Sequence, residues 1–172
     1  MIWLLLFEVF TITFTIGLWI FMKNKGYKNI TRKFLILFFS VLLFEFMSEP
    51  MWLNDGFQKW AYIWQDITWI ITLGWVGIFM FTFLIVDYTF RKTPEKKKFW
   101  IYLLFLEAIV VPIEAGLVIS GIRSYAPILA NTLSGYFIPL TNVPIEAVYA
   151  VPLFTSLIIC FYKYANYLFD RR

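Results

Sequence analysis

The sequence contains no histidine and only one cysteine, Cys160. Histidine is the most common general base near neutral pH and the most common protein ligand of transition metals. A single cysteine excludes an intrachain disulfide framework and a thiolate metal site. Carboxylates are therefore the only side chains left to act as acids or bases near neutral pH, and the sequence predicts no metal site.

Charged residues are also scarce. They make up 15% of the 172 residues, whereas 61% are hydrophobic and 22% are aromatic. Soluble domains contain about 25% charged residues, so this composition predicts a chain embedded in a lipid bilayer. The net charge is +4, but the basic residues lie at the ends of apolar segments, where membrane topology explains them. We expect a multi-pass protein of the cell membrane that binds no nucleic acid.

Five apolar segments are long enough to cross the roughly 30 Å of a bilayer's hydrocarbon core at 1.5 Å per helical residue. They predict an all-α integral membrane protein with a single transmembrane helical domain over residues 1–172. The first segment lacks a basic start and a small-residue cleavage site, which favours a mature helix over a signal peptide. The expected helices cover residues 1–22, 34–53, 66–88, 99–120 and 136–162.

Lysine and arginine gather in alternate connections between these segments. Five basic residues follow the first segment and five follow the third, whereas the two opposite connections contain only Lys59 and Arg123. The positive-inside rule then predicts the N-terminus outside and the C-terminus in the cytoplasm. The tryptophan-rich connection at 52–64 is expected to form a short amphipathic stretch at the interface, and residues 121–135 are expected to form a loop.

Several glutamates lie at similar depths inside the predicted spans, and no lysine or arginine lies at that depth to neutralise them. A charged carboxylate at a membrane helix centre costs about 2.5 to 3.5 kcal/mol. Protonating a glutamate of ordinary pKa at pH 7 costs about 3.7 kcal/mol. Because these penalties nearly balance and like charges repel, at least one glutamate is expected to stay neutral. A purely structural role is equally open for Glu8, Glu107 and Asp87.

The segment VPIEA occurs once in the fourth predicted span and again in the fifth. A proline inside a helix removes one backbone donor and frees the carbonyl four residues earlier. Each copy therefore predicts a kinked helix in which Pro112 or Pro144 places an acid, Glu114 or Glu146, beside a free acceptor. Asn142 is expected on the same helix face as Glu146.

Aromatic side chains are expected in the same layers as the acids. Their faces attract cations by about 2 kcal/mol or more when desolvated. An apolar cavity that contains a neutral acid and aromatic rings suits protonation of an alkene, and a second carboxylate can then remove a proton from the carbocation. The expected catalytic residues are Glu45, Glu49, Glu107, Glu114 and Glu146, and the expected substrate-binding residues are Asn142, Tyr149, Trp69, Trp75, Phe46 and Phe105.

The stretch SGYFIPLTNVPIEAVYAVPLFTSLIICFYKY resembles a region of the small membrane carotenoid cyclases, the heterodimeric or fused lycopene cyclases. The resemblance covers about thirty residues, and VVPIEAG in the fourth span is a fainter second copy. In that family a second acid follows the Pro-x-Glu motif, whereas this chain has Ala115 and Ala147. The resemblance implies cofactor-independent proton transfer on a lipid-soluble isoprenoid, with Glu114 and Glu146 as the motif acids. From the shared layer of acids and the paired motifs we expect Glu114 or Glu146 to act as acid and Glu45 or Glu49 as base.

Two other functions fit the same residues. The glutamates could form the relay of a proton-coupled transporter or small channel, with the prolines at its gating points. The chain could also be a non-catalytic subunit that binds a lipid or pigment. A diphosphate-dependent prenyltransferase is disfavoured because the Asp-rich motifs that hold magnesium are missing. A homodimer and a partnership with a second small membrane subunit both stay open.

Overall fold

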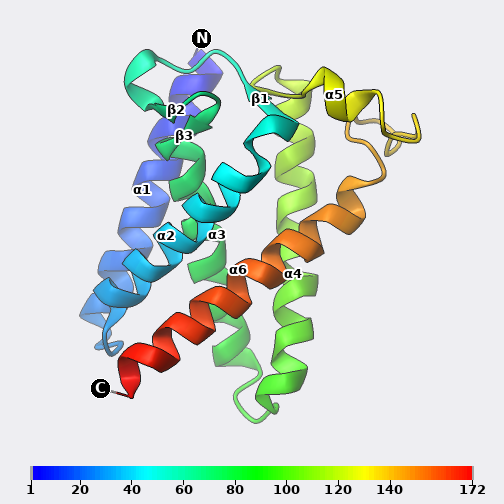
Figure 1. The fold of residues 1–172 in the computed structure, drawn as a ribbon. Helices are drawn as coiled ribbons and strands as arrows, with labels where there is room; N and C mark the ends of the chain where they lie inside the picture. Colours follow the sequence, from blue (N-terminus) through cyan, green and yellow to red (C-terminus); the bar gives the residue numbers. More distant parts are fainter. Residues whose placement is uncertain (1, 172) are drawn as a thin grey trace.

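The computed structural model describes residues 2–171 and contains five long helices (Figure 1). Each of the five is long and apolar enough to cross a membrane, which confirms the predicted number of long apolar helices. The structure is mostly helical, as expected. The long helices are α1 (Ile2–Asn24), α2 (Ile30–Ser48), α3 (Trp69–Thr89), α4 (Glu95–Ile119) and α6 (Ala147–Asp170).

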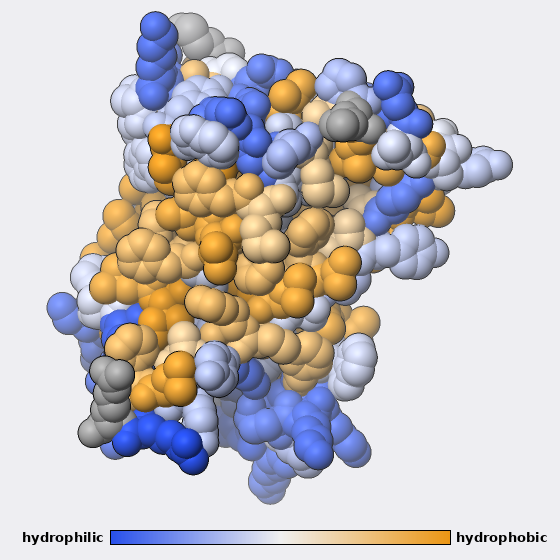
Figure 2. All heavy atoms as spheres, in the orientation of Figure 1, coloured by the Kyte–Doolittle hydropathy of each residue, from blue (hydrophilic) through white to orange (hydrophobic). Residues whose placement is uncertain are grey.

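Helix α3 lies at the centre of the bundle and packs against α1, α2 and α4, while α6 runs obliquely across α2 and α4 (Figure 1). The main core forms where these helices meet, and it buries Leu37, Val76, Phe79, Leu106 and Ile159 almost completely. The two termini lie at opposite ends of the bundle, as an odd number of antiparallel crossings requires. An apolar band separates the polar ends on the face shown in Figure 2.

One end of the bundle, here called the basic end, carries the α1–α2 and α3–α4 connections and the C-terminus. Ion pairs join the helices there: Arg32 contacts Asp170, and Lys163 Nζ lies 3.0 Å from Glu95 Oε2. The basic residues thus gather on one side of the apolar band, as their distribution in the sequence predicts.

The opposite end, here called the strand end, contains two small antiparallel sheets that the sequence did not predict. Strand β1 (Trp52–Asn54) pairs with β4 (Arg123–Tyr125), and β2 (Tyr62–Trp64) pairs with β3 (Ile67–Thr68). The first pair ties the end of α2 to the end of α4. The short helices at this end are η1 (Glu49–Met51), η2 (Lys59–Ala61) and α5 (Pro127–Ala130).

Several helices begin or end at other residues than predicted, because of prolines and a threonine N-cap. Helix α2 ends at Ser48 instead of residue 53, and the chain continues as the 3-10 helix η1 (Glu49–Met51), because Pro50 has no N–H to donate to the carbonyl four residues earlier. Helix α3 begins only after Thr68, whose side chain accepts a hydrogen bond from the Ile71 N–H at 3.3 Å. Helix α4 begins earlier than expected, immediately after Pro94.

The largest boundary error concerns the fifth helix, which covers Ala147–Asp170 instead of 136–162. Residues 136–145 form a tight hairpin, in which the Ile145 N–H donates to the Tyr136 carbonyl at 3.0 Å. Leu140 adopts a positive φ of 65° at the turn. A left-handed residue at 140 and a proline at 144 are incompatible with a continuous helix through this segment.

The two VPIEA copies therefore have different structures. Pro112 lies inside α4 as predicted, whereas Pro144 lies in the hairpin and Glu146 is the residue that precedes α6. The prediction of a second kinked helix is wrong, and so is the placement of Asn142 on a shared helix face with Glu146. The proline inside α6 is Pro152.

Candidate functional site

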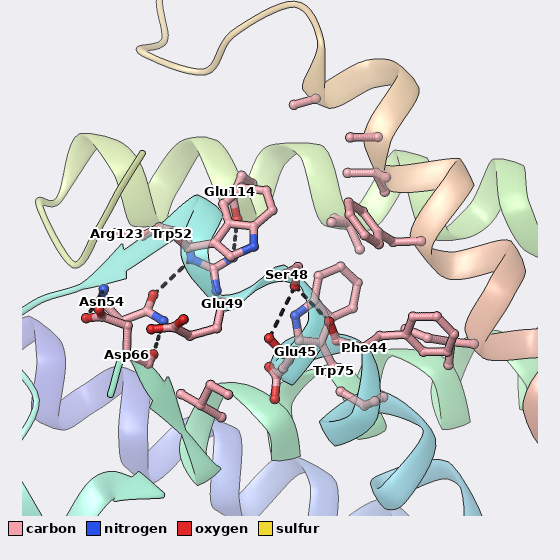
Figure 3. Close-up of a pocket in the computed structure, with 18 of the residues that line it drawn as sticks. Phe44, Glu45, Ser48, Glu49, Trp52, Asn54, Asp66, Trp75, Glu114 and Arg123 are labelled. Atoms are coloured by element: carbon pink, nitrogen blue, oxygen red, sulfur yellow. Dashed lines mark hydrogen bonds and ion pairs between the residues drawn. The ribbon is translucent and has the colours of Figure 1, made fainter. Parts of the chain in front are cut away.

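A cavity of about 80 Å³ lies at the strand end, enclosed by α2, α3, α4, α6 and the strands (Figure 3). Four carboxyl side chains line it: Glu45 from α2, Glu49 from η1, Asp66 from the β2–β3 connection and Glu114 from α4. Segments far apart in the sequence thus bring acids to one hollow. Three of the five glutamates predicted to be catalytic meet here.

Glu114 forms a buried ion pair with Arg123. Its Oε2 lies 2.9 Å from Arg123 Nη1, and the residues are only 6% and 7% exposed. The Tyr125 hydroxyl donates to the other oxygen of Glu114 at 3.3 Å. No basic residue lies within the predicted spans beside the acids, but Arg123 reaches Glu114 from outside them, because β4 turns the chain back over the end of α4.

The strand pairing holds Arg123 in place. In the register of β1 and β4, Arg123 lies opposite Asn54, and its Nε donates to Asn54 Oδ1 at 3.0 Å. The Asn54 side chain is itself fixed, because its Nδ2 donates to the Asp66 carbonyl at 2.6 Å. The guanidinium also lies over the Trp52 ring, 5.2 Å from its centroid. Figure 3 shows Arg123 between Asn54 and Glu114.

Tyr125 remains a hydrogen-bond donor at all ordinary pH values. Burial and the negative charge of Glu114 raise the pKa of its hydroxyl above the usual range. Together with Arg123, it therefore presents two hydrogen-bond donors to the Glu114 carboxyl group, and the charge of Arg123 makes its bond the stronger one.

Glu45 has a different environment. Its Oε2 lies within hydrogen-bonding distance of the Thr72 hydroxyl, which also lies 3.1 Å from the Thr68 carbonyl. No ion pair involves Glu45 among the residues that the structure describes. A hydroxyl has one proton, so Thr72 can donate to Glu45 or to the carbonyl, but not to both.

Aromatic rings form much of the cavity wall. The aromatic lining consists of Phe44, Trp52, Trp75, Tyr125 and Phe154. Of the residues predicted to bind substrate, only Trp75 lines this cavity.

The other predicted binding residues lie elsewhere. Trp69 donates to the Trp60 carbonyl at 3.2 Å, and Phe46 packs on Trp64. Phe105 packs against the main core, and both Asn142 and Tyr149 are exposed, Tyr149 by 72%.

Two predicted catalytic glutamates also lie outside the cavity lining. Both carboxyl oxygens of Glu107 are buried without a hydrogen-bond partner in the described part of the chain. Glu146 Oε1 accepts a 2.7 Å hydrogen bond from the Ser134 N–H, which lowers the pKa of Glu146 below its usual range. Glu146 thus fastens the loop before α6 and does not meet Glu114 in the cavity.

The chain matches no protein-family model, no curated protein and no solved structure. The chemistry of the cavity is therefore inferred from its residues and their geometry.

Proposed function

We propose that the protein is a cofactor-independent membrane enzyme that isomerises or cyclises an isoprenoid by proton transfer. One observation carries this proposal: carboxyl groups from α2 and α4 line one aromatic cavity, and only Glu114 is paired with a buried arginine. The cavity therefore offers one carboxylate that is held charged and another that is free to hold a proton. Acid–base catalysis needs these two states at one site.

Glu45 is the proposed acid. Arg123 is the one cationic residue among the described residues that line the cavity, against four carboxyl groups. Repulsion between like charges in a poorly hydrated hollow favours the neutral form of an unpaired acid. A neutral Glu45 donates a hydrogen bond to Thr72 Oγ1, and Thr72 then donates its own to the Thr68 carbonyl, so that both contacts of the Thr72 hydroxyl are satisfied.

The reaction starts when the Glu45 proton is transferred to one carbon of an alkene. The π electron pair forms the new C–H bond, and the neighbouring carbon becomes a cation that aromatic walls such as Trp75 and Phe154 stabilise. A second alkene of the same chain closes a ring when it attacks this cation.

Glu114 is the proposed base. It takes a proton from a carbon next to the cation, and the electrons of that C–H bond form the new double bond. The total number of protons is unchanged, and the cycle closes when the proton on Glu114 exchanges with solvent and Glu45 is reprotonated. These roles reverse the assignment predicted from the sequence, because Arg123 is ion-paired with Glu114.

The bilayer supplies the substrate in this proposal. We place the protein in the cell membrane with the basic end in the cytoplasm, following the positive-inside rule. The strand end and its cavity then lie toward the outer leaflet. A homodimer or a second small membrane subunit is compatible with this arrangement.

The side-chain packing between the strand end and the basic end of the bundle favours an enzyme over a transporter. Val76, Phe79 and Leu106, all fully buried, lie between the cavity and the basic end. A proton relay through the bundle needs polar groups or water at this level. The buried carboxyl at this level, Glu107, has no hydrogen-bond partner in the described part of the chain, so it is not linked to a polar relay there, and this favours chemistry confined to the strand end.

The test is a pair of glutamate variants expressed in cells whose isoprenoids are extracted and analysed by mass spectrometry. We expect Glu45→Gln to abolish the product that the wild type forms, because the amide cannot supply the proton. Glu107→Gln is the control: it removes a buried carboxyl group outside the cavity lining and should leave product formation intact. Equal product from wild type and Glu45→Gln would refute the assignment. A polyene that co-purifies with the wild type unchanged would instead indicate a binding subunit.

A further inference from the structure

A second and larger hollow of about 570 Å³ runs along the side of the bundle. Helices α1 and α4 form its walls and α3 forms its floor. Its lining is mostly apolar, and on α1 it extends from Trp3 to Thr15, which corresponds to ~18 Å at 1.5 Å per residue. We call this hollow the lateral groove.

Two glycines contribute to the groove. Gly74 on the floor and Gly116 on the α4 wall present no side chain to it. A Cβ at Gly116 would meet no atom within 4 Å, so the space beside this residue is empty.

The groove faces the surroundings that a lipid would occupy. Large apolar side chains next to it on both walls are exposed, among them Leu6 and Val9 on α1 and Ile119 on α4. In a bundle whose helices span a bilayer, such surfaces contact acyl chains. A ligand can therefore reach the groove sideways without crossing water.

The groove borders the cavity. Four residues line both hollows: Trp75, Val110, Glu114 and Arg123. The Glu114–Arg123 pair thus lies in the wall that the two hollows share. A chain that lies along the groove brings its end to the proposed catalytic base.

From this shared wall we infer that the lateral groove is the binding site for the hydrocarbon chain of a linear polyisoprenoid, which enters from the bilayer between α1 and α4. This inference rests on the proposed function for the identity of the chain. The groove itself is a physical feature that binding experiments test without catalysis.

The experiment uses the full-length protein in phospholipid vesicles and geranylgeraniol carrying a photoreactive diazirine. After irradiation, peptide mass spectrometry locates the label. We expect the label on groove residues such as Phe10, Ile78 and Ile113. Unlabelled geranylgeraniol should compete, whereas a saturated fatty alcohol of similar length should compete at least about tenfold less well, a difference of ~1.4 kcal/mol.

Matched variants give the decisive comparison. Gly116→Phe fills the groove and should reduce labelling there about tenfold, which again corresponds to ~1.4 kcal/mol. Ala108→Phe is the control, since Ala108 is exposed on the same helix but does not line the groove. If Gly116→Phe fails to fold, Ile113→Trp enlarges an exposed groove side chain and serves the same purpose.

Three results would overturn the inference: labelling spread evenly over the apolar helix surfaces, equal competition by the saturated alcohol, or equal labelling of Gly116→Phe and Ala108→Phe. The first two would indicate ordinary lipid. Glu45→Gln separates this inference from the proposed function, because it should retain groove labelling. Labelling without any turnover would refute the proposed reaction and leave the groove assignment standing.

Discussion

Replacing Arg123 with methionine should strongly destabilise the protein. The substitution leaves the Glu114 carboxylate buried, with Tyr125 as the remaining hydrogen-bond donor. Breaking a buried ion pair by removing one partner costs about 3 to 5 kcal/mol. Both residues of the pair are less than 10% exposed, so solvent screening does not reduce this figure.

The double variant Arg123→Met/Glu114→Leu should recover much of the loss, since neither charge is then left unpaired. The energy that couples the two positions should be about 2 to 3 kcal/mol, a typical upper range for directly contacting residues. The contacts of Arg123 with Asn54 and Trp52 are lost in the single and the double variant alike, so the cycle isolates the ion pair.

The assay is reversible unfolding in mixed micelles with an increasing fraction of a denaturing detergent, followed by circular dichroism. Arg32→Met is the matched control, because the Arg32–Asp170 pair at the basic end is 30% and 57% exposed. Exposed pairs contribute about 0 to 1 kcal/mol. If Arg123→Met costs no more than Arg32→Met, the pair at the strand end is hydrated and Glu114 is not held as described.

Two further predictions concern packing and pH. Gly77→Ala should cost about 1 to 3 kcal/mol in the same unfolding assay, because its Cβ would collide with Thr15, whereas Gly17→Ala has open space and should not destabilise the protein. The lowered pKa of Glu146 means that its contribution to stability is present above the ordinary pKa of glutamate and is lost as the pH falls through the lower, folded-state value. The protection of the Ser134 amide against hydrogen exchange should therefore decrease in acid, and Glu146→Gln should remove this pH dependence. If protection in Glu146→Gln falls with pH as it does in the wild type, Glu146 is not the group that titrates.

Hydropathy was sufficient to predict the five helices, because about twenty apolar residues in succession are a strong signal in a single sequence. It was not sufficient for the fifth helix boundary. Residues 136–146 mix apolar side chains with Pro139, Asn142, Pro144 and Glu146, and the turn at Leu140 depends on hydrogen bonds within the hairpin. The presence of a proline did not show whether a segment is helical, since Pro112 and Pro152 lie inside helices and Pro144 does not.

Part of the cavity could be predicted from the burial cost of carboxylates. This reasoning found Glu45, Glu49 and Glu114, which line one hollow. It missed Arg123, because only the tertiary pairing of β1 with β4 brings this residue to Glu114. One signal was present in the sequence: Arg123 is an arginine in a connection that the positive-inside rule predicts to be poor in basic residues.

Sequence alone also could not separate the acids that share the cavity from those that do not. Glu107 and Glu114 are seven residues apart on one helix face, yet only Glu114 lines the cavity. The difference depends on how α6 and the strands pack over the end of α4, which residue spacing does not encode.

Proton transfer from solvent to the substrate tests the central claim most directly. The purified protein is incubated in D2O with the isoprenoid fraction of its source cells, and the product is analysed by mass spectrometry. Because the proton on Glu45 exchanges with solvent, the wild type should place deuterium on a carbon of the product, and Glu45→Gln should yield no labelled product. A product that forms without deuterium, or one that Glu45→Gln labels equally, would contradict acid catalysis by this residue.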